Sequence, residues 1–420
     1  MRQTNLHPCV GQVVAGKADY ARLRAMGALD GIRVIDAGII VQGPQAGQTM
    51  VDMGADVIKV EMPGLGDQAR WIPISANDSR APYFIANNRG KRSITLDLRL
   101  PDGAEAFLRL IETADVVISN FKAGTLDEWG VGYEDAAARN PRIIYGMGTT
   151  FGPEGPAAAR EGADLAGQAA GGLISTTGMD DGDPSPVGAV IADHIGAQNM
   201  TIGILAAIVA REQTGRGQRI DVSLFGSQLY AQNAEYTSYF LTGKAPGRAN
   251  RGHPLLPAVY GLVETADGWL ALVGVPPQQR DGFYAAIGRS ELLEDQRFQP
   301  FILDPQDRKE LFTELTKTFR TRTTAEWGDA LTAAGCRWAP VNDYAAATAD
   351  PHSMINGYMQ DIDHPEYGKV KMMGSPIRMS DTPVVPGRIS PELGADTELL
   401  LVELGYDWDQ ITNMRESRSI

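Results

Sequence analysis

The stretch that decides the fold runs from Val187 to Ser227 and reads VGAVIADHIGAQNMTIGILAAIVAREQTGRGQRIDVSLFGS. Its apolar start, Val187 to Ala192, predicts a strand, and the apolar pattern from Ile195 to Arg211 predicts a helix. A second strand is expected from Arg219 to Phe225, after a glycine-rich helix stop. Asp193 would then end the first strand, where side chains of open α/β sheets face the ligand crevice. This position makes Asp193 the first candidate for the chemistry.

Strand and helix patterns also alternate on the N-terminal side of this stretch, which indicates a parallel sheet. The further strands expected there are Arg33 to Asp36, Asp56 to Glu61, Ser93 to Asp97, Asp115 to Ser119 and Arg142 to Gly146.

Beyond the stretch, the pattern changes to a hairpin followed by helices. Two strands, Ala258 to Thr265 and Trp269 to Val273, flank the turn signal Ala266-Asp267-Gly268. Helices are expected to about Ala334, then extended segments, and a closing helix at Thr397 to Leu404. The predicted fold class is α/β: a large Rossmann-like open-sheet domain with a smaller inserted α+β domain. The expected division is an N-terminal extension (1–29), the large domain (30–225), a linker and small domain (226–340), and a return to the large domain (341–420).

Composition excludes several classes of function. The chain has 420 residues, 43% of them hydrophobic, and a formal net charge of -14. Nucleic acid and anionic membranes are therefore not expected as partners, because both need basic surfaces. Two cysteines, Cys9 and Cys336, give no disulfide framework and favour a reducing compartment, so we expect a cytoplasmic protein. The segment Met1 to Leu29 has no signal-peptide pattern, and the apolar run Ile202 to Ala210 is too short to span a bilayer.

The usual cofactor motifs are missing. Histidines occur at 7, 194, 253, 352 and 364, too scattered to predict a metal site. The segment Asp36 to Gly47 is glycine-rich but lacks the Gly-x-Gly-x-x-Gly spacing of dinucleotide folds, so a nicotinamide cofactor is not expected. Phosphate-loop and serine-hydrolase signatures are also missing. We expect these glycines to serve tight turns and close packing.

Several motifs, weak singly but specific in their order, carry a family resemblance: Gly54 to Glu61, Asn88 to Asp97, Ala114 to Val117 with Asn120-Phe121, Gln168 to Gly172, Thr214 to Gln218, Ala339 to Val341 with Asp350-Pro351, and Gly374 to Pro376. With them the chain resembles the family III CoA-transferases, which include formyl-CoA transferase and carnitine CoA-transferase, over nearly its whole length after residue 29.

The resemblance implies that CoA moves from an acyl-CoA thioester to a free carboxylic acid. Asp193 matches the family's nucleophile, which forms a mixed anhydride and then an aspartyl-CoA thioester. From the residues alone, Asp193 is more simply an N-cap of the helix near Ile195. The resemblance also implies no permanently bound cofactor, CoA thioester as substrate, and a homodimer of interlaced subunits.

Other site residues follow from the resemblance. Asp164 falls where formyl-CoA transferase has a glutamate, and its supporting acidic role competes with a solvated or capping carboxylate. Val41 takes the place of the family's glutamine, and Gln42 could supply the amide from the next position.

For the CoA tail the resemblance points to residues in three segments: Leu96, Asp97, Leu98 and Arg99; Asn120, Phe121 and Lys122; and the basic residues Lys91 and Arg92, beside Arg89. Two family arginines are replaced by Met62 and Glu128. Ile72 stands where formyl-CoA transferase has a tryptophan near its substrate, and Tyr83, Tyr236 and Tyr239 either line the pocket or pack in the core.

Three alternatives stay open. An α-methylacyl-CoA racemase keeps the aspartate but needs a histidine where this chain has Ala163, before Asp164. The transfer could also be intramolecular, with an isomerase outcome. A catalytically inactive acyl-CoA-binding protein is the third.

Overall fold

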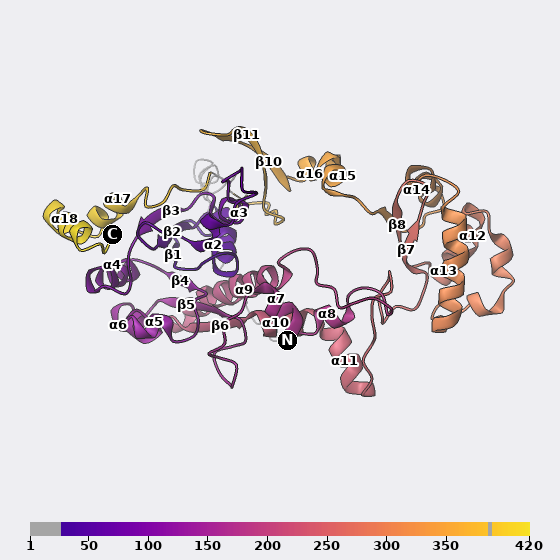
Figure 1. Cartoon of the computed structure of the whole chain (residues 1–420), viewed down its shortest axis with the longest axis horizontal. Helices are drawn as coiled ribbons and strands as arrows, with labels where there is room; N and C mark the ends of the chain where they lie inside the picture. The colour runs from indigo at the N-terminus through magenta and orange to yellow at the C-terminus, as the bar shows by residue number, and fades with distance from the viewer. Residues whose placement is uncertain (1–26, 385–388) are drawn as a thin grey trace, which may run out of the picture. The chain divides into compact units, whose positions relative to one another are not determined.

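The computed structural model describes residues 27–384 and 389–420, which group into two compact units (Figure 1). Unit 1 contains the described residues up to Thr149, then Ala197–Val222 and the described residues from Met354 onward. Unit 2 contains Thr150–Gly196 and Ser223–Ser353. These are groups of residues that pack together, and the domain boundaries expected from the sequence stay a prediction. The expected extension, residues 1–29, lies almost entirely outside the described residues.

A six-stranded sheet forms the centre of unit 1. Its order is β3 (Arg92–Thr95), β2 (Asp56–Glu61), β1 (Arg33–Asp36), β4 (Val116–Ser119), β5 (Ile144–Thr149) and β6 (Arg219–Ser223). The pairings of β1 with β2 and β4, of β2 with β3, and of β4 with β5 are all parallel. The predicted parallel sheet is thus confirmed for these strands, and β1 and β2 have the predicted bounds.

The strands are rich in valine and isoleucine because both sheet faces are buried. Val34 belongs to one apolar cluster with Met50 of α2 (Gln42–Asp52) and Ile204 of α9 (Ile191–Thr214). The next residue, Ile35, belongs to another cluster with Phe107 of α4 (Pro101–Glu112). Successive side chains of a strand point to opposite faces, so helices cover the sheet on both sides.

The remaining elements of unit 1 are short helices, a two-stranded hairpin and a 3-10 turn. They are α3 (Pro82–Asn88), α5 (Thr125–Glu128), α6 (Tyr133–Arg139), the hairpin β10 (Met359–His364) and β11 (Gly368–Met373), α17 (Thr397–Glu403), α18 (Trp408–Glu416) and the 3-10 turn Gln68–Trp71. The predicted closing helix is α17, and α18 was not expected.

One predicted strand is wrong. Residues 187–190 form no regular element, and Ile191 already begins α9, so Val187 to Ala192 is not a strand. Only Ile191 and Ala192 of the run belong to the helix. A short apolar run cannot by itself distinguish a buried strand from the segment that enters a buried helix. Likewise, the strand expected to reach Phe225 ends at Ser223, whose side chain caps α10 (Leu224–Ala231) by accepting the Gly226 N–H.

Unit 2 contains a three-stranded antiparallel sheet packed against helices. The predicted hairpin is confirmed as β7 (Tyr260–Glu264) and β8 (Trp269–Val273), and β9 (Trp338–Pro340) pairs with β8. The buried faces of Val263, Leu270 and Leu272 share a core with Leu311 and Phe319. The helices of unit 2 are α7 (Asp164–Ala170), α8 (Leu173–Thr176), α10, α11 (Asn233–Thr242), α12 (Arg280–Ala286), α13 (Pro305–Phe319), α14 (Thr324–Ala333), α15 (Tyr344–Ala349) and α16 (Pro351–Ile355), with 3-10 turns at Pro277–Gln279, Ser290–Leu293 and Gln296–Phe298.

Within 27–384 and 389–420, no helix combines the length and apolar character that a bilayer-crossing segment needs. In the same residues, no group of three or more His, Cys, Asp or Glu side chains is placed to hold a metal ion.

Candidate active site

Asp193 lies in the first turn of α9, where Asp164 meets it from α7. The Asp164 Oδ1 accepts hydrogen bonds from the backbone N–H groups of Ala192 (2.7 Å) and Asp193 (3.3 Å). Asp164 thereby satisfies two donors that a helix start leaves without intrahelical partners. Asp193 is the third residue of the helix and not its N-cap, so the capping explanation of Asp193 is wrong. Asp164, with only 9% of its surface exposed, has the capping role and is not a solvated loop residue.

The two carboxyl groups interact electrostatically. Burial, and the nearby charge of Asp164, raise the pKa of Asp193 to about 7. Both causes disfavour the charged form, because a carboxylate loses hydration on burial and is repelled by a second carboxylate. A carboxyl group with this pKa is more basic than an ordinary aspartate, yet a large fraction is ionised at neutral pH. Such a carboxyl group is available in its ionised form at neutral pH and is a stronger nucleophile than an ordinary aspartate.

Gln168 holds this acidic pair in place. Its Nε2 donates to Asp164 Oδ2 at 2.6 Å, and its Oε1 accepts the Val187 N–H at 3.0 Å. Gln168 is almost completely buried. The side chain therefore links the Asp164 cap to the segment that leads into α9, which explains the glutamine of the Gln168 to Gly172 motif.

A second constellation lies in unit 1, at the carboxyl ends of its parallel strands. The strand order 3-2-1-4-5-6 reverses direction between β1 and β4, and ligands of open α/β sheets bind at such a switch point. The loop after β1 and Asn120 after β4 meet there. Asn120 accepts the Ile39 N–H at 2.6 Å and donates to the Ile39 carbonyl at 2.9 Å. Its side chain therefore holds the loop and is only partly free for a ligand.

The glycines of this loop serve close packing, as predicted. A Cβ on Gly43 would lie 2.9 Å from Asn120 Oδ1 and 3.0 Å from the Cα of Gly38. A Cβ on Gly38 would lie 2.9 Å from the Cα of Gly43. The loop and the first turn of α2 can approach each other only because neither residue has a side chain.

Gln42 is the first residue of α2, and its amide is buried at 2% exposure. The Gln42 Nε2 has no hydrogen-bond partner among the described residues. A buried amide N–H without a partner costs free energy, and this cost is removed when a bound oxygen accepts the bond. Val41 precedes it as the N-cap residue and is also buried, so its side chain packs in the protein.

The residues predicted to bind the CoA tail differ in how far their side chains are accessible to a ligand. Leu96 and Leu98 are core side chains, so only their backbone could face a ligand. Asp97 pairs with Arg99 at 2.7 Å. Phe121 packs edge-on against Trp129, in the turn that connects α5 to α6. Lys122 is exposed.

Arg99 also lies beside one of the departures from the family pattern. The Sδ of Met62 is 3.9 Å from Arg99 Nη2. Arg99, in the turn after β3, therefore places a guanidinium next to the position where the family has an arginine.

Two predicted basic residues are paired with carboxylates of the sheet. Lys91 is buried, and its ammonium group contacts Asp36 at 2.6 Å, so it is already neutralised inside the protein. Arg92 begins β3 and pairs with Asp56 at the start of β2, at the opposite end of the sheet from Arg99. The Lys91 ammonium thus reaches the carboxyl end of β1, where it also donates to the Pro44 carbonyl, but it is buried there. Arg92 is not brought to this edge of the sheet.

A pocket of about 310 Å³ lies in unit 2, next to the Gln168 to Gly172 motif. Tyr236 and Tyr239 line it, as considered from the sequence, together with Gly172. The Tyr236 hydroxyl donates to the Gly171 carbonyl at 3.2 Å. Tyr83 instead packs against a small buried cluster in unit 1.

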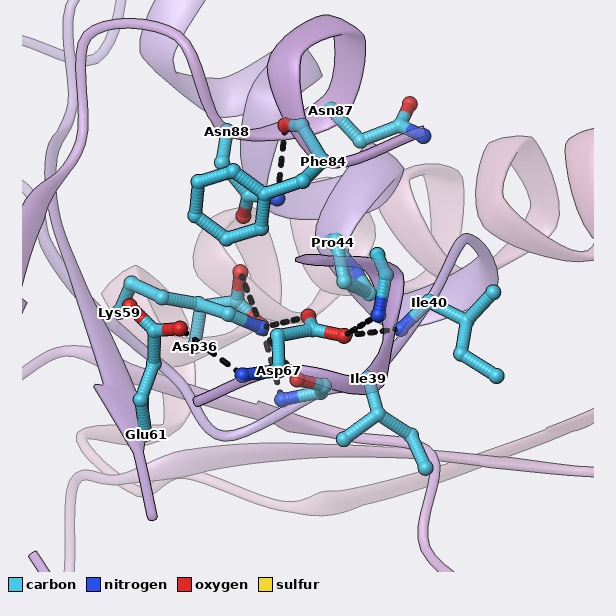
Figure 2. Close-up of polar contacts among 12 residues, drawn as sticks. Asp36, Ile39, Ile40, Pro44, Lys59, Glu61, Asp67, Phe84, Asn87 and Asn88 are labelled. Carbon is cyan, nitrogen blue, oxygen red and sulfur yellow. Dashed lines mark hydrogen bonds and ion pairs between the residues drawn. The ribbon is translucent and has the colours of Figure 1, made fainter. Parts of the chain in front are cut away.

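Sequence reasoning missed Lys59 and Asp67. Figure 2 shows the Lys59 ammonium between two carboxylates, 2.7 Å from Asp67 and 3.9 Å from Asp36. Asp67 Oδ1 in turn accepts the Ile40 N–H at 2.9 Å. The signal was present in the strand Val57-Ile58-Lys59-Val60, because a lysine within a strand buried on both faces requires a charged partner.

Comparisons with known proteins identify the family of the chain. Residues 29–397 match the CoA-transferase family III. The succinyl-CoA:mesaconate CoA-transferase of Haloarcula hispanica is 36% identical over 390 residues, which cover 90% of this chain and 97% of that protein. The succinate–glutarate CoA-transferase of Agrobacterium fabrum is 36% identical over 387 residues, covering 90% of this chain and 95% of that protein.

Solved structures show the same relationship. The crystal structure of a CAIB/BAIF family protein from Brucella suis has a TM-score of 0.80 to this chain and 35% sequence identity, and the match covers 90% of this chain and all of that one. The match to the family spans the sheet, Asp164, Asp193 and the loop with Gln42. The chain therefore belongs to CoA-transferase family III and is an enzyme of this type.

Proposed function

We propose that this enzyme transfers CoA from an acyl-CoA thioester to a free carboxylic acid through covalent intermediates on Asp193. The observation that carries the proposal is the position of Asp193: a partly buried carboxyl group in the first turn of α9, beside Asp164, with its pKa raised to about 7. A raised pKa at neutral pH suits a carboxylate that must act as a nucleophile.

The reaction balances without a redox partner. The Asp193 carboxylate attacks the thioester carbonyl and expels CoA as a thiolate, which leaves a mixed anhydride. The thiolate attacks the aspartyl carbonyl of this anhydride, releases the first acid and forms an aspartyl-CoA thioester. The acceptor carboxylate then attacks that thioester and forms a second anhydride, and the thiolate returns to the acceptor's carbonyl. The products are a new acyl-CoA and free Asp193.

Gln42 is proposed to stabilise the oxygen that gains negative charge during these attacks. Its Nε2 is a buried donor without a partner among the described residues, so no protein hydrogen bond has to break before it acts. Asp164 supports Asp193 by capping α9 and by raising the pKa of the nucleophile.

The proposed binding of the CoA tail uses the carboxyl-end edge of the sheet. Arg99 and Lys122 supply positive charge for its phosphates. Leu96, Asp97, Leu98 and Phe121 contribute mainly backbone and packing around it. Asn120 contributes its backbone only, because its side chain holds the loop after β1.

Dicarboxylic acids are the proposed substrate class. Relatives that are 36% identical are named for succinyl-CoA with mesaconate and for succinate with glutarate. We propose succinyl-CoA as donor and a second dicarboxylate as acceptor. We also propose a homodimer of interlaced subunits in the cytoplasm. Light scattering on dilution tests the dimer: interlaced subunits stay dimeric until they unfold, and a folded monomer contradicts the proposal.

The experiment for the chemistry is mass spectrometry of the protein after incubation with succinyl-CoA, with hydroxylamine or borohydride trapping. The expected result is a modification located at Asp193, lost in Asp193→Ala while CoA still binds. Full retention of CoA exchange in Asp193→Ala would falsify the nucleophile. Exchange of the α-proton of an acyl-CoA without trapping at Asp193 would instead support the racemase alternative.

A further inference from the structure

The loop Gly38–Val41, which leads from β1 into α2, contains a backbone conformation that its sequence does not favour. Ile40 has a φ of 61°, in the left-handed region. A β-branched residue is rarely found there, because its Cβ crowds the following carbonyl oxygen. Such a residue persists only where its surroundings fix it, and such positions gather at functional sites.

Side chains from β1, from β2 and from the loops after β2 and β4 hold three successive residues of this loop. Asp36 Oδ1 accepts the Gly38 N–H at 2.8 Å, and the Lys59 ammonium donates to the Gly38 carbonyl. Asn120 binds both polar backbone groups of Ile39. Asp67 Oδ1 accepts the Ile40 N–H at 2.9 Å (Figure 2). The left-handed residue and the two residues before it are therefore held by hydrogen bonds from side chains outside the loop.

The charges behind these bonds are buried and balanced. The ammonium groups of Lys59 and Lys91 face the carboxylates of Asp36 and Asp67, and all four residues are at most 5% exposed. Burial alone would lower the pKa of Lys59, but the carboxylates outweigh it and raise that pKa. Buried ion pairs are often no more stabilising than apolar side chains of the same volume. A gain in stability is therefore weak as an explanation of this cluster, whereas its hydrogen bonds to the loop point to control of the loop.

We propose that Lys59, Asp67 and Asn120 are positioning residues for CoA transfer. They hold Ile40 in its left-handed conformation and thereby fix the direction in which the first turn of α2 presents the Gln42 amide to the thioester oxygen. The inference rests on the proposed function, since it assigns these residues to the oxyanion-type hydrogen bond of Gln42. A small displacement of such a donor is enough to slow the chemical step.

The test uses the full chain and a suppressor substitution. Asp67→Ala and Asn120→Ala each remove one side chain that hydrogen-bonds to the loop. Asp67→Ala leaves a buried charge without its partner and could fail to fold, whereas Asn120→Ala leaves none, so Asn120→Ala keeps the test available. In each, kcat for CoA exchange is expected to fall by about tenfold or more, while KM for acyl-CoA changes by less than about threefold. Adding Ile40→Gly to either variant is expected to restore about a third or more of the lost kcat, because glycine adopts a positive φ without strain.

Asp52→Ala is the matched control. It breaks the Asp52–Arg89 pair, which is also buried and lies at the other end of α2, with contacts of 2.6 and 2.7 Å. It is expected to lower the melting temperature and leave kcat near that of the unchanged protein. An equal kcat loss in Asp52→Ala, or no recovery with Ile40→Gly, overturns the proposal.

Backbone hydrogen exchange separates this inference from the proposed function. The amides of Ile39 and Ile40 are expected to exchange slowly in the unchanged protein and about tenfold faster in Asp67→Ala or Asn120→Ala. If the enzyme shows no CoA exchange, the proposed function fails, yet these amides still report on the loop. Unaltered exchange at both amides overturns the positioning role whatever the activity.

Discussion

The Asp164 carboxylate caps the helix that carries Asp193, with its Oδ1 3.3 Å from the Asp193 backbone nitrogen. One acidic side chain thus has two effects on the other. It orders the turn on which Asp193 lies, and its charge contributes to the raised pKa of Asp193. The first three predictions follow from this pair of effects.

The rate of CoA transfer is expected to depend on the ionisation of Asp193. Because the pKa of this group is about 7, kcat/KM for acyl-CoA should rise with pH up to about 7 and then level off. Asp164→Asn removes a charge that raises this pKa and should shift the rise to lower pH. Initial rates from pH 5 to 9 test this, and a flat profile would contradict an ionising nucleophile in this range.

Asp193→Asn is expected to stabilise the protein at alkaline pH. The folded pKa of Asp193 is about 7 and the model-compound value is 3.8, so ionisation favours the unfolded chain as pH rises between these values. The stability associated with the protonated group is present below the lower value and lost above the higher one. A shift of this size corresponds to at most about 4 kcal/mol, and we expect about 2 kcal/mol. Thermal unfolding should show a larger gain at pH 8 than at pH 4.5, and an equal gain at both would contradict the pKa.

Loss of the cap should destabilise α9. Asp164→Ala removes the acceptor for the Ala192 and Asp193 N–H groups, with an expected cost of about 1 to 2 kcal/mol in the free energy of unfolding. Asp164→Asn keeps an oxygen at the same place and should lose less than half as much. Urea unfolding of both variants measures the difference. Asp304→Ala, at the exposed N-cap of α13, is a comparison cap outside the site.

Gly43→Ala should disturb the loop without touching a charged group. Its Cβ would lie 2.9 Å from Asn120 Oδ1, so Asn120 or the helix has to shift. We expect CoA exchange to fall by about tenfold or more. Gly282→Ala in α12 is the control, since the nearest atom to its Cβ is 3.9 Å away and alanine favours a helix. Normal activity in Gly43→Ala would show that the loop tolerates the displacement.

Much of the sheet could be predicted from the sequence, because buried parallel strands are continuous apolar runs with sharp ends. β1 and β2 were predicted residue for residue, and the hairpin of β7 and β8 by its turn. The segment Val187 to Ala192 failed for a physical reason. Its apolar residues fit either a strand or the start of a buried helix, and the side chain that decides for the helix, Asp164, lies 28 residues before Ala192.

The sequence named candidate residues for the site, but it could not give their contacts. The raised pKa of Asp193 depends on burial and on Asp164, neither of which a linear pattern can give. Lys91 was expected to face phosphate because it lies in a basic run, but the fold turns it inward to Asp36. A sequence shows charges along the chain, and only the fold shows which of them are already neutralised.

The buried cluster of Lys59, Lys91, Asp36 and Asp67 also limits how this protein can evolve. Changing any one of the four leaves an uncompensated charge inside the protein, which is strongly destabilising, whereas changing a cation and an anion together keeps the balance. A single substitution at these positions is therefore expected to be selected against, and substitutions there are expected to occur in pairs of one cation and one anion. Libraries that vary these four codons jointly should recover folded variants that single-site scans miss.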